Sequence, residues 1–291
     1  MILAAAFSLN PIADVQSMLA YDFMRNAFVA GGFIALAAGL VGYFVVLRNQ
    51  VFTTDALGHV AFTGGLGGLL FGLDLLLGVF GSTIAVALAM GTLGGRGRGR
   101  DVAIGTVFAW VLGLGVLFLS LYTTSKSAAV GMVGISVLFG SILGLQPAQT
   151  MVAALAGIGI CITLLAVARP LLFLSLDPEV AASRGVPSRT VTAIFLVLVA
   201  LTVAEAVQAV GALLIFGLMV TPAAVAQNLT VRPYRGLALS AGLAVAAVWV
   251  GLVLAFYLSY PASFLITTLI FTALVVSLVI RGAWPRGARK W

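Results

Sequence analysis

The chain of 291 residues is 62% hydrophobic and 8% charged, and its mean hydropathy is +1.22. Soluble globular domains of this length do not have such a composition, so the sequence predicts an all-α, polytopic membrane protein. The net charge of +7 does not indicate nucleic-acid binding, because the basic residues fall in connections on one side of a membrane. A lone cysteine, Cys161, excludes a disulfide framework and a thiolate metal cluster.

Apolar runs predict about nine membrane-spanning helices, since one crossing takes roughly 20 residues. The expected spans are 24–47, 51–73, 75–93, 102–122, 151–168, 190–207, 211–229, 236–258 and 261–280. The run 130–145 is shorter and rich in glycine, so we expect a re-entrant or interfacial segment there. We treat residues 1–291 as one transmembrane domain, with a periplasmic tail (1–22) and a basic cytoplasmic tail (281–291).

The basic residues predict the topology. With nine crossings and a cytoplasmic C-terminus, 13 of the 15 basic residues lie in the cytoplasm, and only Arg25 and Lys126 fall outside. If 130–145 were a full span, every later connection would change sides and this asymmetry would be lost. The N-terminus is therefore expected outside the cell.

A pair of ionisable residues interrupts the second span. Asp55 lies four residues before His59, the only histidine of the chain, so on a helix both side chains point from the same face. Ionisable groups in the hydrocarbon cost roughly 2.5 to 3.5 kcal/mol each and tend to mark a functional path. The functional interpretation is that Asp55 and His59 bind a divalent metal ion. The alternative is that Asp55 caps the helix and that His59 is a hydrogen-bonded packing residue.

The connection after the 151–168 span has the punctuation of a short, complete helix. Asp177 is a candidate N-cap, Pro178 a first helical residue, Gly185 a left-handed C-terminal stop and Pro187 a block to continuation. Residues 177–186 are therefore expected to form a cytoplasmic helix that contacts a partner. A merely well-capped connection is the alternative.

Together, these stretches resemble the permease subunit of ABC importers for zinc, manganese or iron, from about residue 24 to residue 280. Three motifs in the same order carry the resemblance: Val46-Leu47-Arg48 with Asp55-Ala56-Leu57-Gly58-His59; Asp177-Pro178-Glu179 through Gly185-Val186-Pro187; and Gln208-Ala209-Val210-Gly211 through Thr221-Pro222-Ala223-Ala224. The resemblance implies a type II fold similar to that of the cobalamin importer, without its first helix.

The resemblance also implies roles and partners. Residues of the cytoplasmic helix would couple to the ATPase, namely Asp177, Pro178, Glu179, Arg184 and Gly185, while Gln208, Gly211 and Pro222 would line or pack the path. The permease would be a homodimer in the bacterial plasma (inner) membrane, surrounded by lipid. Its partners would be a cytoplasmic ATPase and an extracytoplasmic metal-binding protein, and the transported metal would be its substrate rather than a permanent cofactor.

Two features depart from the family pattern. Further histidines, which members often carry in their loops, are missing here, and Glu205 stands where an apolar or hydroxyl residue is expected. Glu205 is therefore an accessory candidate metal ligand, and a hydrogen bond between helices is the alternative. Which of the three metals is transported stays open.

Other functions remain to be compared. The same architecture could import a siderophore or a vitamin, which would not need an acid and an imidazole, and a secondary transporter would not need the helix at 177–186. An intramembrane hydrolase is disfavoured because one histidine cannot supply HExxH and because no GxSxG motif occurs. No GxxxxGK[ST] segment occurs either, so the chain is expected to be a transport subunit and not an enzyme.

Overall fold

The computed structural model describes residues 18–93, 98–125, 140–212, 214–258 and 260–283. Within these residues every regular element is helical, which confirms the predicted all-α class. The elements are α2 (Asp22–Leu47), α3 (Val51–Leu70), α4 (Leu75–Leu93), α5 (Arg98–Ser125), η2 (Ile142–Gly144), α7 (Pro147–Leu176), α8 (Pro178–Ser183), α9 (Ser188–Ala209), α10 (Ile215–Leu229), α11 (Pro233–Leu258) and α12 (Ala262–Ala283).

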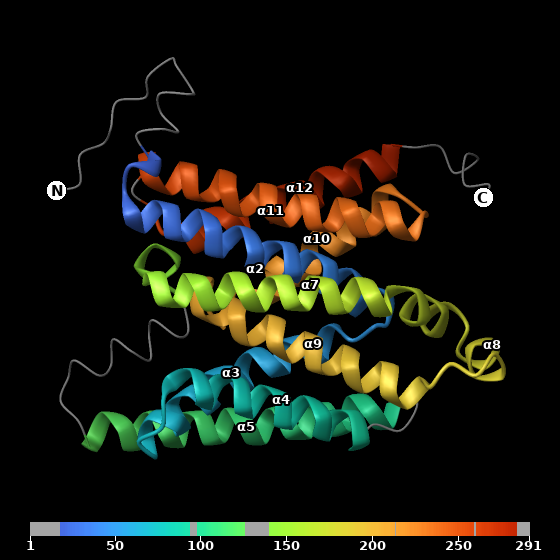
Figure 1. The fold of residues 1–291 in the computed structure, drawn as a ribbon, viewed down its shortest axis with the longest axis horizontal. Coiled ribbons are helices and arrows are strands. Elements are labelled where there is room, and N and C mark those ends of the chain that lie inside the picture. The colour runs from blue at the N-terminus through green and yellow to red at the C-terminus, as the bar shows by residue number, and fades with distance from the viewer. Residues whose placement is uncertain (1–17, 94–97, 126–139, 213, 259, 284–291) are drawn as a thin grey trace.

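The long helices form three groups that lie side by side (Figure 1). Helices α2, α7 and α9 pack on one another in the middle. On one side α3 contacts α4 and α5, and on the other side α10, α11 and α12 contact one another. The middle group joins both, since α9 packs on α3 and α4 while α2 packs on α10 and α11.

Helix α2 can hold this central place because small residues let its neighbours approach closely. A Cβ atom on Gly42 would lie 2.8 Å from the carbonyl carbon of Met219 in α10, too close for any side chain. On the α11 side, the Ser240 hydroxyl donates a 2.6 Å hydrogen bond to the carbonyl oxygen of Gly39. Glycines of α2 thus set the distance to two neighbouring helices.

Seven helices of the described chain are long and apolar enough to cross a membrane: α2, α4, α5, α7, α9, α11 and α12. Two of the nine expected spans fall short of this standard. Helix α3 is not among the seven, and α10, with 15 residues, is shorter than a usual span. A helix of 15 residues rises about 22 Å, against a hydrocarbon core of about 30 Å.

Several expected helix boundaries are wrong by three residues or more, and two of them have a clear physical cause. The span expected to end at residue 168 continues through Pro170 to Leu176. Proline removes one backbone donor, a loss that a helix packed among other helices tolerates. The span expected from Gly211 begins only at Ile215, because Gly211 has a φ of 95°, which a helix does not accommodate.

Several predictions concern residues outside the described part. These are most of the periplasmic tail (1–17), most of the segment 130–145 and most of the basic tail (284–291). Of the expected re-entrant segment, only residues 140–145 are described, and they contain the single turn η2. The re-entrant arrangement therefore stays a prediction.

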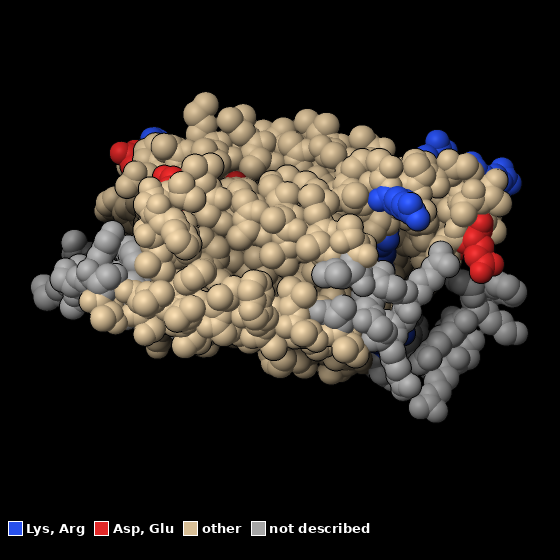
Figure 2. Space-filling view, turned by 90° about the horizontal axis from the view of Figure 1, so that it is seen from below, with Lys and Arg blue, Asp and Glu red and all other residues tan. Residues whose placement is uncertain are grey.

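Charged side chains gather toward the two ends of the helices, and the surface between them is nearly free of charge on the face that Figure 2 shows. The end beyond α7, where α8 projects in Figure 1, carries most of the visible basic side chains. Such a pattern is typical of a protein whose uncharged middle lies in the bilayer.

Candidate metal site and coupling helix

Helix α3 carries both members of the ionisable pair. Asp55 and His59 lie within the helix, one turn apart, and both are partly exposed. The helix is preceded by Gln50, whose side chain forms no capping hydrogen bond. Asp55 therefore does not cap α3, and this alternative is wrong. Within the described residues neither Asp55 nor His59 forms a hydrogen bond or an ion pair, which leaves a carboxylate and an imidazole free for a ligand.

The imidazole of His59 contacts an aromatic ring of α5. The ring centroids of His59 and Phe108 are 5.1 Å apart, with an angle of 66° between the ring planes. Edge-to-face contacts of this kind restrict how a ring can turn. Phe108 therefore packs against His59 and supports its orientation. The alternative expected a hydrogen-bonded packing residue, and within the described residues His59 packs without a hydrogen bond.

Between the two residues, Gly58 lets α3 approach the connection between α9 and α10. A Cβ atom on Gly58 would lie 3.1 Å from the carbonyl oxygen of Ala212 and 3.1 Å from Ile215. Gln208 and Gly211 lie just before this contact, and the Gln208 carbonyl accepts a 3.3 Å hydrogen bond from the amide of Ser141. The motif around Gly211 thus lies against the helix that carries Asp55 and His59, whereas Pro222 is buried inside α10.

Glu205 lies in α9 with 3% of its surface exposed. In the described part of the chain, two buried side-chain oxygens have no hydrogen-bond partner: Glu205 Oε1 and Thr54 Oγ1. A buried polar atom without a partner costs about 1 to 3 kcal/mol and calls for an explanation. Thr54 directly precedes Asp55, so one of these oxygens lies on each of the packed helices α3 and α9.

The described residues contain no group of three or more His, Cys, Asp and Glu side chains that could hold a metal ion. The fold of one chain therefore does not bring Glu205 together with Asp55 and His59 in a three-ligand site. What it provides is a two-residue pair on α3 and a separate buried carboxylate on α9, the helix against which α3 packs.

The short helix α8 has the predicted capping residues. The Asp177 carboxylate accepts a 3.0 Å hydrogen bond from the amide of Val180, and Pro178 is the first helical residue. Gly185 follows the helix with a φ of 77°, a left-handed conformation that suits glycine. Asp177, Glu179 and Arg184 are exposed. Within α8 only Ala181 is buried.

A contact between α2 and α9 connects the α8 end of the molecule to α3. Arg48, which follows α2, donates a 3.1 Å hydrogen bond from Nη2 to the Thr192 hydroxyl. Its guanidinium carbon also lies 5.2 Å from the ring centroid of Phe195. Thr192 and Phe195 are in the first two turns of α9, directly after α8, and Arg48 directly precedes the short connection into α3.

Comparison with known proteins identifies the chain. Residues 20–281 match the ABC 3 transport family. The chain belongs to this family. An uncharacterised membrane protein of Synechocystis sp., slr2045, is 31% identical over 276 residues, which cover 94% of this chain and 96% of the relative. The manganese import system permease protein ScaB of Streptococcus parasanguinis is 28% identical, over 84% of this chain and 86% of the relative.

The fold has a solved counterpart as well. A chain of PsaBC from Streptococcus pneumoniae, solved in complex with Fab, superposes with a TM-score of 0.81 at 24% identity, over 92% of this chain and 95% of that chain. The chain therefore has the ABC permease fold that its motifs suggested, and its relatives are transport components rather than enzymes.

The sequence did not indicate two residues that contact or adjoin the Asp55–His59 pair. Phe108 is far from His59 in the chain, and no local pattern marks it as a ring partner. Thr54 had a weak signal, since Thr53-Thr54 is a polar pair next to Asp55 in an otherwise apolar helix. Its buried, unpartnered hydroxyl became evident only once α3 was packed.

Replacing Glu205 by Gln separates a charge role from a hydrogen-bond role. The amide keeps the size and the hydrogen-bonding capacity but removes the negative charge, so a carboxylate that attracts a cation is lost. We expect metal uptake to fall by about tenfold, because a charge buried among the helices is screened little from a passing cation. Membrane abundance should stay normal. Radiolabelled metal uptake by whole cells measures the effect, and unchanged uptake would make Glu205 structural.

Proposed function

We propose that this chain is the membrane-spanning permease subunit of an ABC importer that moves a divalent transition-metal ion into the cytoplasm. The single observation that carries the proposal is the Asp55–His59 pair, one turn apart on α3 and without hydrogen-bond partners within the described residues. Curated relatives that are named for manganese or iron transport support the same class of substrate. Manganese is the first metal to test, and zinc and iron follow.

The chemistry of the pair fits these metals. Asp55 offers a hard oxygen and His59 a borderline nitrogen, which suits zinc, manganese or ferrous iron better than magnesium or calcium with their oxygen shells. Two ligands would bind a metal too weakly for a permanent site, but a transported ion must also leave. In a homodimer, two pairs facing the central path would bring the ligand count to four.

The proposed topology keeps nine crossings, made by the seven long apolar helices together with α3 and α10. Helix α3 would lie among other helices, where partly polar spans are tolerated. Arg48, Arg169, Arg184 and Arg189 would all lie at the cytoplasmic end, as the positive-inside rule requires. The N-terminus would then lie outside and the C-terminus in the cytoplasm of a bacterial inner-membrane protein.

Energy would come from a separate ATPase bound at α8. Exposed Asp177, Glu179 and Arg184 give this helix a charged outer surface for a partner. Motion of α8 would pass directly to the start of α9. The hydrogen bond from Arg48 to Thr192 would then carry that motion to the connection that leads into α3 and Asp55. An extracytoplasmic metal-binding protein would deliver the ion at the opposite end, and no cofactor would stay bound.

Loss of either path residue should abolish transport. We expect Asp55→Asn and His59→Ala each to lower manganese uptake by at least about tenfold, because each removes one of two ligands. Radiolabelled manganese, zinc and iron are measured separately in cells that also contain the cognate ATPase and binding protein. Membrane abundance is measured by immunoblot.

Thr63→Val is a matched control in the same helix. The Thr63 hydroxyl donates a 3.1 Å hydrogen bond to the Val111 carbonyl, so this change disturbs the packing of α3 on α5 while both Asp55 and His59 are retained. Uptake should survive in this variant. Wild-type metal uptake by His59→Ala would contradict the metal proposal. If Asp55→Asn and His59→Ala both continued to take up a siderophore or a vitamin, the organic-substrate alternative would replace it.

Gly185→Val tests the role of α8. Gly185 has a φ of 77°, where a β-branched side chain is strained, so the substitution should displace the end of α8. We expect ATP hydrolysis to become uncoupled from uptake, with an intact complex in the membrane. ATPase activity and uptake are measured on the same reconstituted vesicles.

The control for backbone strain is Gly72→Val. Gly72 has a φ of 74° and, like Gly185, no neighbouring atom within 4 Å of an added Cβ, but it lies at the opposite end of α3. Gly72→Val therefore introduces the same kind of backbone strain as Gly185→Val, but at a position away from α8. If both variants transport equally well at equal expression, α8 does not transmit the motion of the ATPase.

A further inference from the structure

An apolar groove of about 790 Å³ runs along the surface between α2 and α11. Phe28, Val29, Gly32 and Leu36 line it from α2, while five residues between Val245 and Leu254 line it from α11. Its volume lies in the range of roughly 300 to 1,000 Å³ that is usual for small-molecule sites. The groove is open to the surroundings at Val29 and Trp249, which are 42% and 48% exposed.

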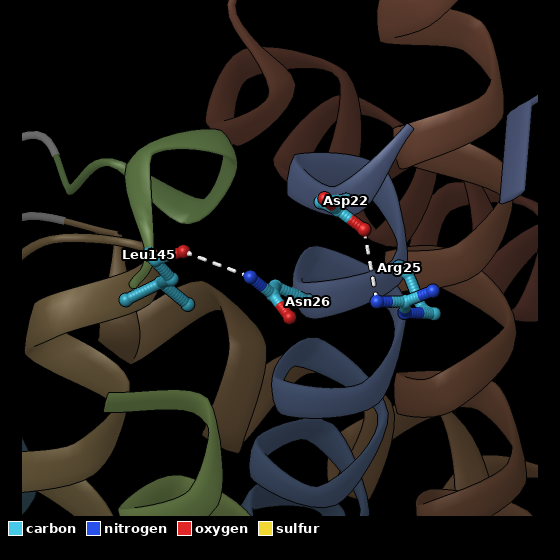
Figure 3. A network of polar contacts seen from close by, with 4 residues as sticks. All are labelled: Asp22, Arg25, Asn26 and Leu145. Atoms are coloured by element: carbon cyan, nitrogen blue, oxygen red, sulfur yellow. Dashed lines mark hydrogen bonds and ion pairs between the residues drawn. The ribbon is translucent and has the colours of Figure 1, made fainter. Parts of the chain in front are cut away.

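One end of this groove carries two opposite charges. Arg25 precedes Phe28 and Val29 by three and four residues, so it lies on the same stripe of α2, one turn nearer to the helix start. It forms a 2.9 Å ion pair with Asp22, one further turn toward the helix start. Both side chains are open to the surroundings, at 62% and 82% exposure. Figure 3 shows this pair on the side of α2 that faces away from the contact between Asn26 and Leu145.

Aromatic side chains mark the depth of this end in the membrane. The ring of Tyr21 lies 6.0 Å from that of Phe256 in α11, and Phe256 in turn lies 5.5 Å from Tyr257. Tyrosines of membrane proteins gather at the level of the lipid headgroups. Asp22 and Arg25 are therefore at headgroup level. The groove extends from there into the hydrocarbon.

We infer that this groove binds one molecule of phosphatidylethanolamine, a lipid with a zwitterionic headgroup. The acyl chain, phosphate and ammonium of this lipid come in the same order as the groove, Arg25 and Asp22 along α2. An acyl chain fits the apolar groove, the phosphate meets the Arg25 guanidinium, and the terminal ammonium meets the Asp22 carboxylate, which lies nearest to the helix start. Arginine is well suited to a phosphate, because its planar donors can bind two oxygens together.

The pairing of charges selects among lipids. Phosphatidylglycerol has the same phosphate but no ammonium, so it would leave Asp22 beside an added negative charge. Phosphatidylethanolamine satisfies both residues. The inference needs only the membrane location of the family and does not depend on which substrate is transported.

Native mass spectrometry of the full-length chain tests the inference. The protein is stripped of lipid in mild detergent and then incubated with equal amounts of dioleoyl phosphatidylethanolamine and dioleoyl phosphatidylglycerol. We expect one phosphatidylethanolamine per chain to be retained preferentially. Asp22→Asn should reduce the preference for phosphatidylethanolamine by about two- to fivefold, which is the range that one exposed ion pair supports. Arg25→Gln should lower the retention of both lipids.

Matched variants separate this groove from general lipid contact. A Cβ atom on Gly32 would lie 3.1 Å from Trp249 Nε1, so Gly32→Leu fills the groove and should remove the retained lipid. Gly159→Leu adds the same side chain to an exposed position of α7 with no atom within 4 Å, and should change nothing. Val29→Phe narrows the groove from its rim. It is the second groove variant, to be used if Gly32→Leu does not fold. For Arg25, the exposed Arg235 supplies the control Arg235→Gln.

Three outcomes would overturn the inference. The first is equal retention of both lipids by the wild type. The second is unchanged retention in folded Gly32→Leu and Val29→Phe. The third is efficient disulfide-linked dimer formation by Val29→Cys in a Cys161→Ala background, because a second copy would then cover the groove.

Discussion

Close packing around α2 is the constraint on which the rest of the structure depends. This helix contacts α7, α9, α10 and α11, and it can do so because Gly42 admits the backbone of α10. In a bilayer, helices gain little from burying apolar surface, so short interhelical distances and hydrogen bonds such as Ser240 to Gly39 contribute more. The position of α2 then fixes where its C-terminal end, Arg48 and the start of α3 are placed.

From that end, two functions meet in a short stretch of chain. Arg48 holds the first turns of α9 through Thr192 and Phe195, and α9 begins directly after α8. On its other side Arg48 is followed by α3, which carries Asp55 and His59. Helix α8, the proposed contact for the ATPase, is thus connected through one arginine to Asp55 and His59, the proposed metal ligands. Such a contact lets a small displacement of α8 change the setting of α3, provided that both helices move as rigid elements.

The sequence predicted the parts of this fold that local chemistry determines. Apolar runs located the helices, Asp177 and Gly185 defined α8, and the spacing of Asp55 and His59 put both on one face of α3. What it did not predict depends on distant neighbours. Helix α7 continues through Pro170 because it lies among other helices, and α10 is short because Gly211 takes a left-handed conformation. Phe108 and the unpartnered Thr54 hydroxyl became evident only through the packing of α3 on α5 and α9.

The most direct test of the central claim uses the fact that His59 is the only histidine of the chain. The protein is produced without a histidine tag, with natural or ¹⁵N-labelled histidine in this chain alone, and is loaded with Mn²⁺. Electron spin echo envelope modulation then detects nitrogen bound to the metal. The proposal predicts a ¹⁴N coupling that changes to a ¹⁵N coupling on labelling and that is absent in His59→Ala. A Mn²⁺ signal from the loaded transporter without any histidine nitrogen coupling would contradict it.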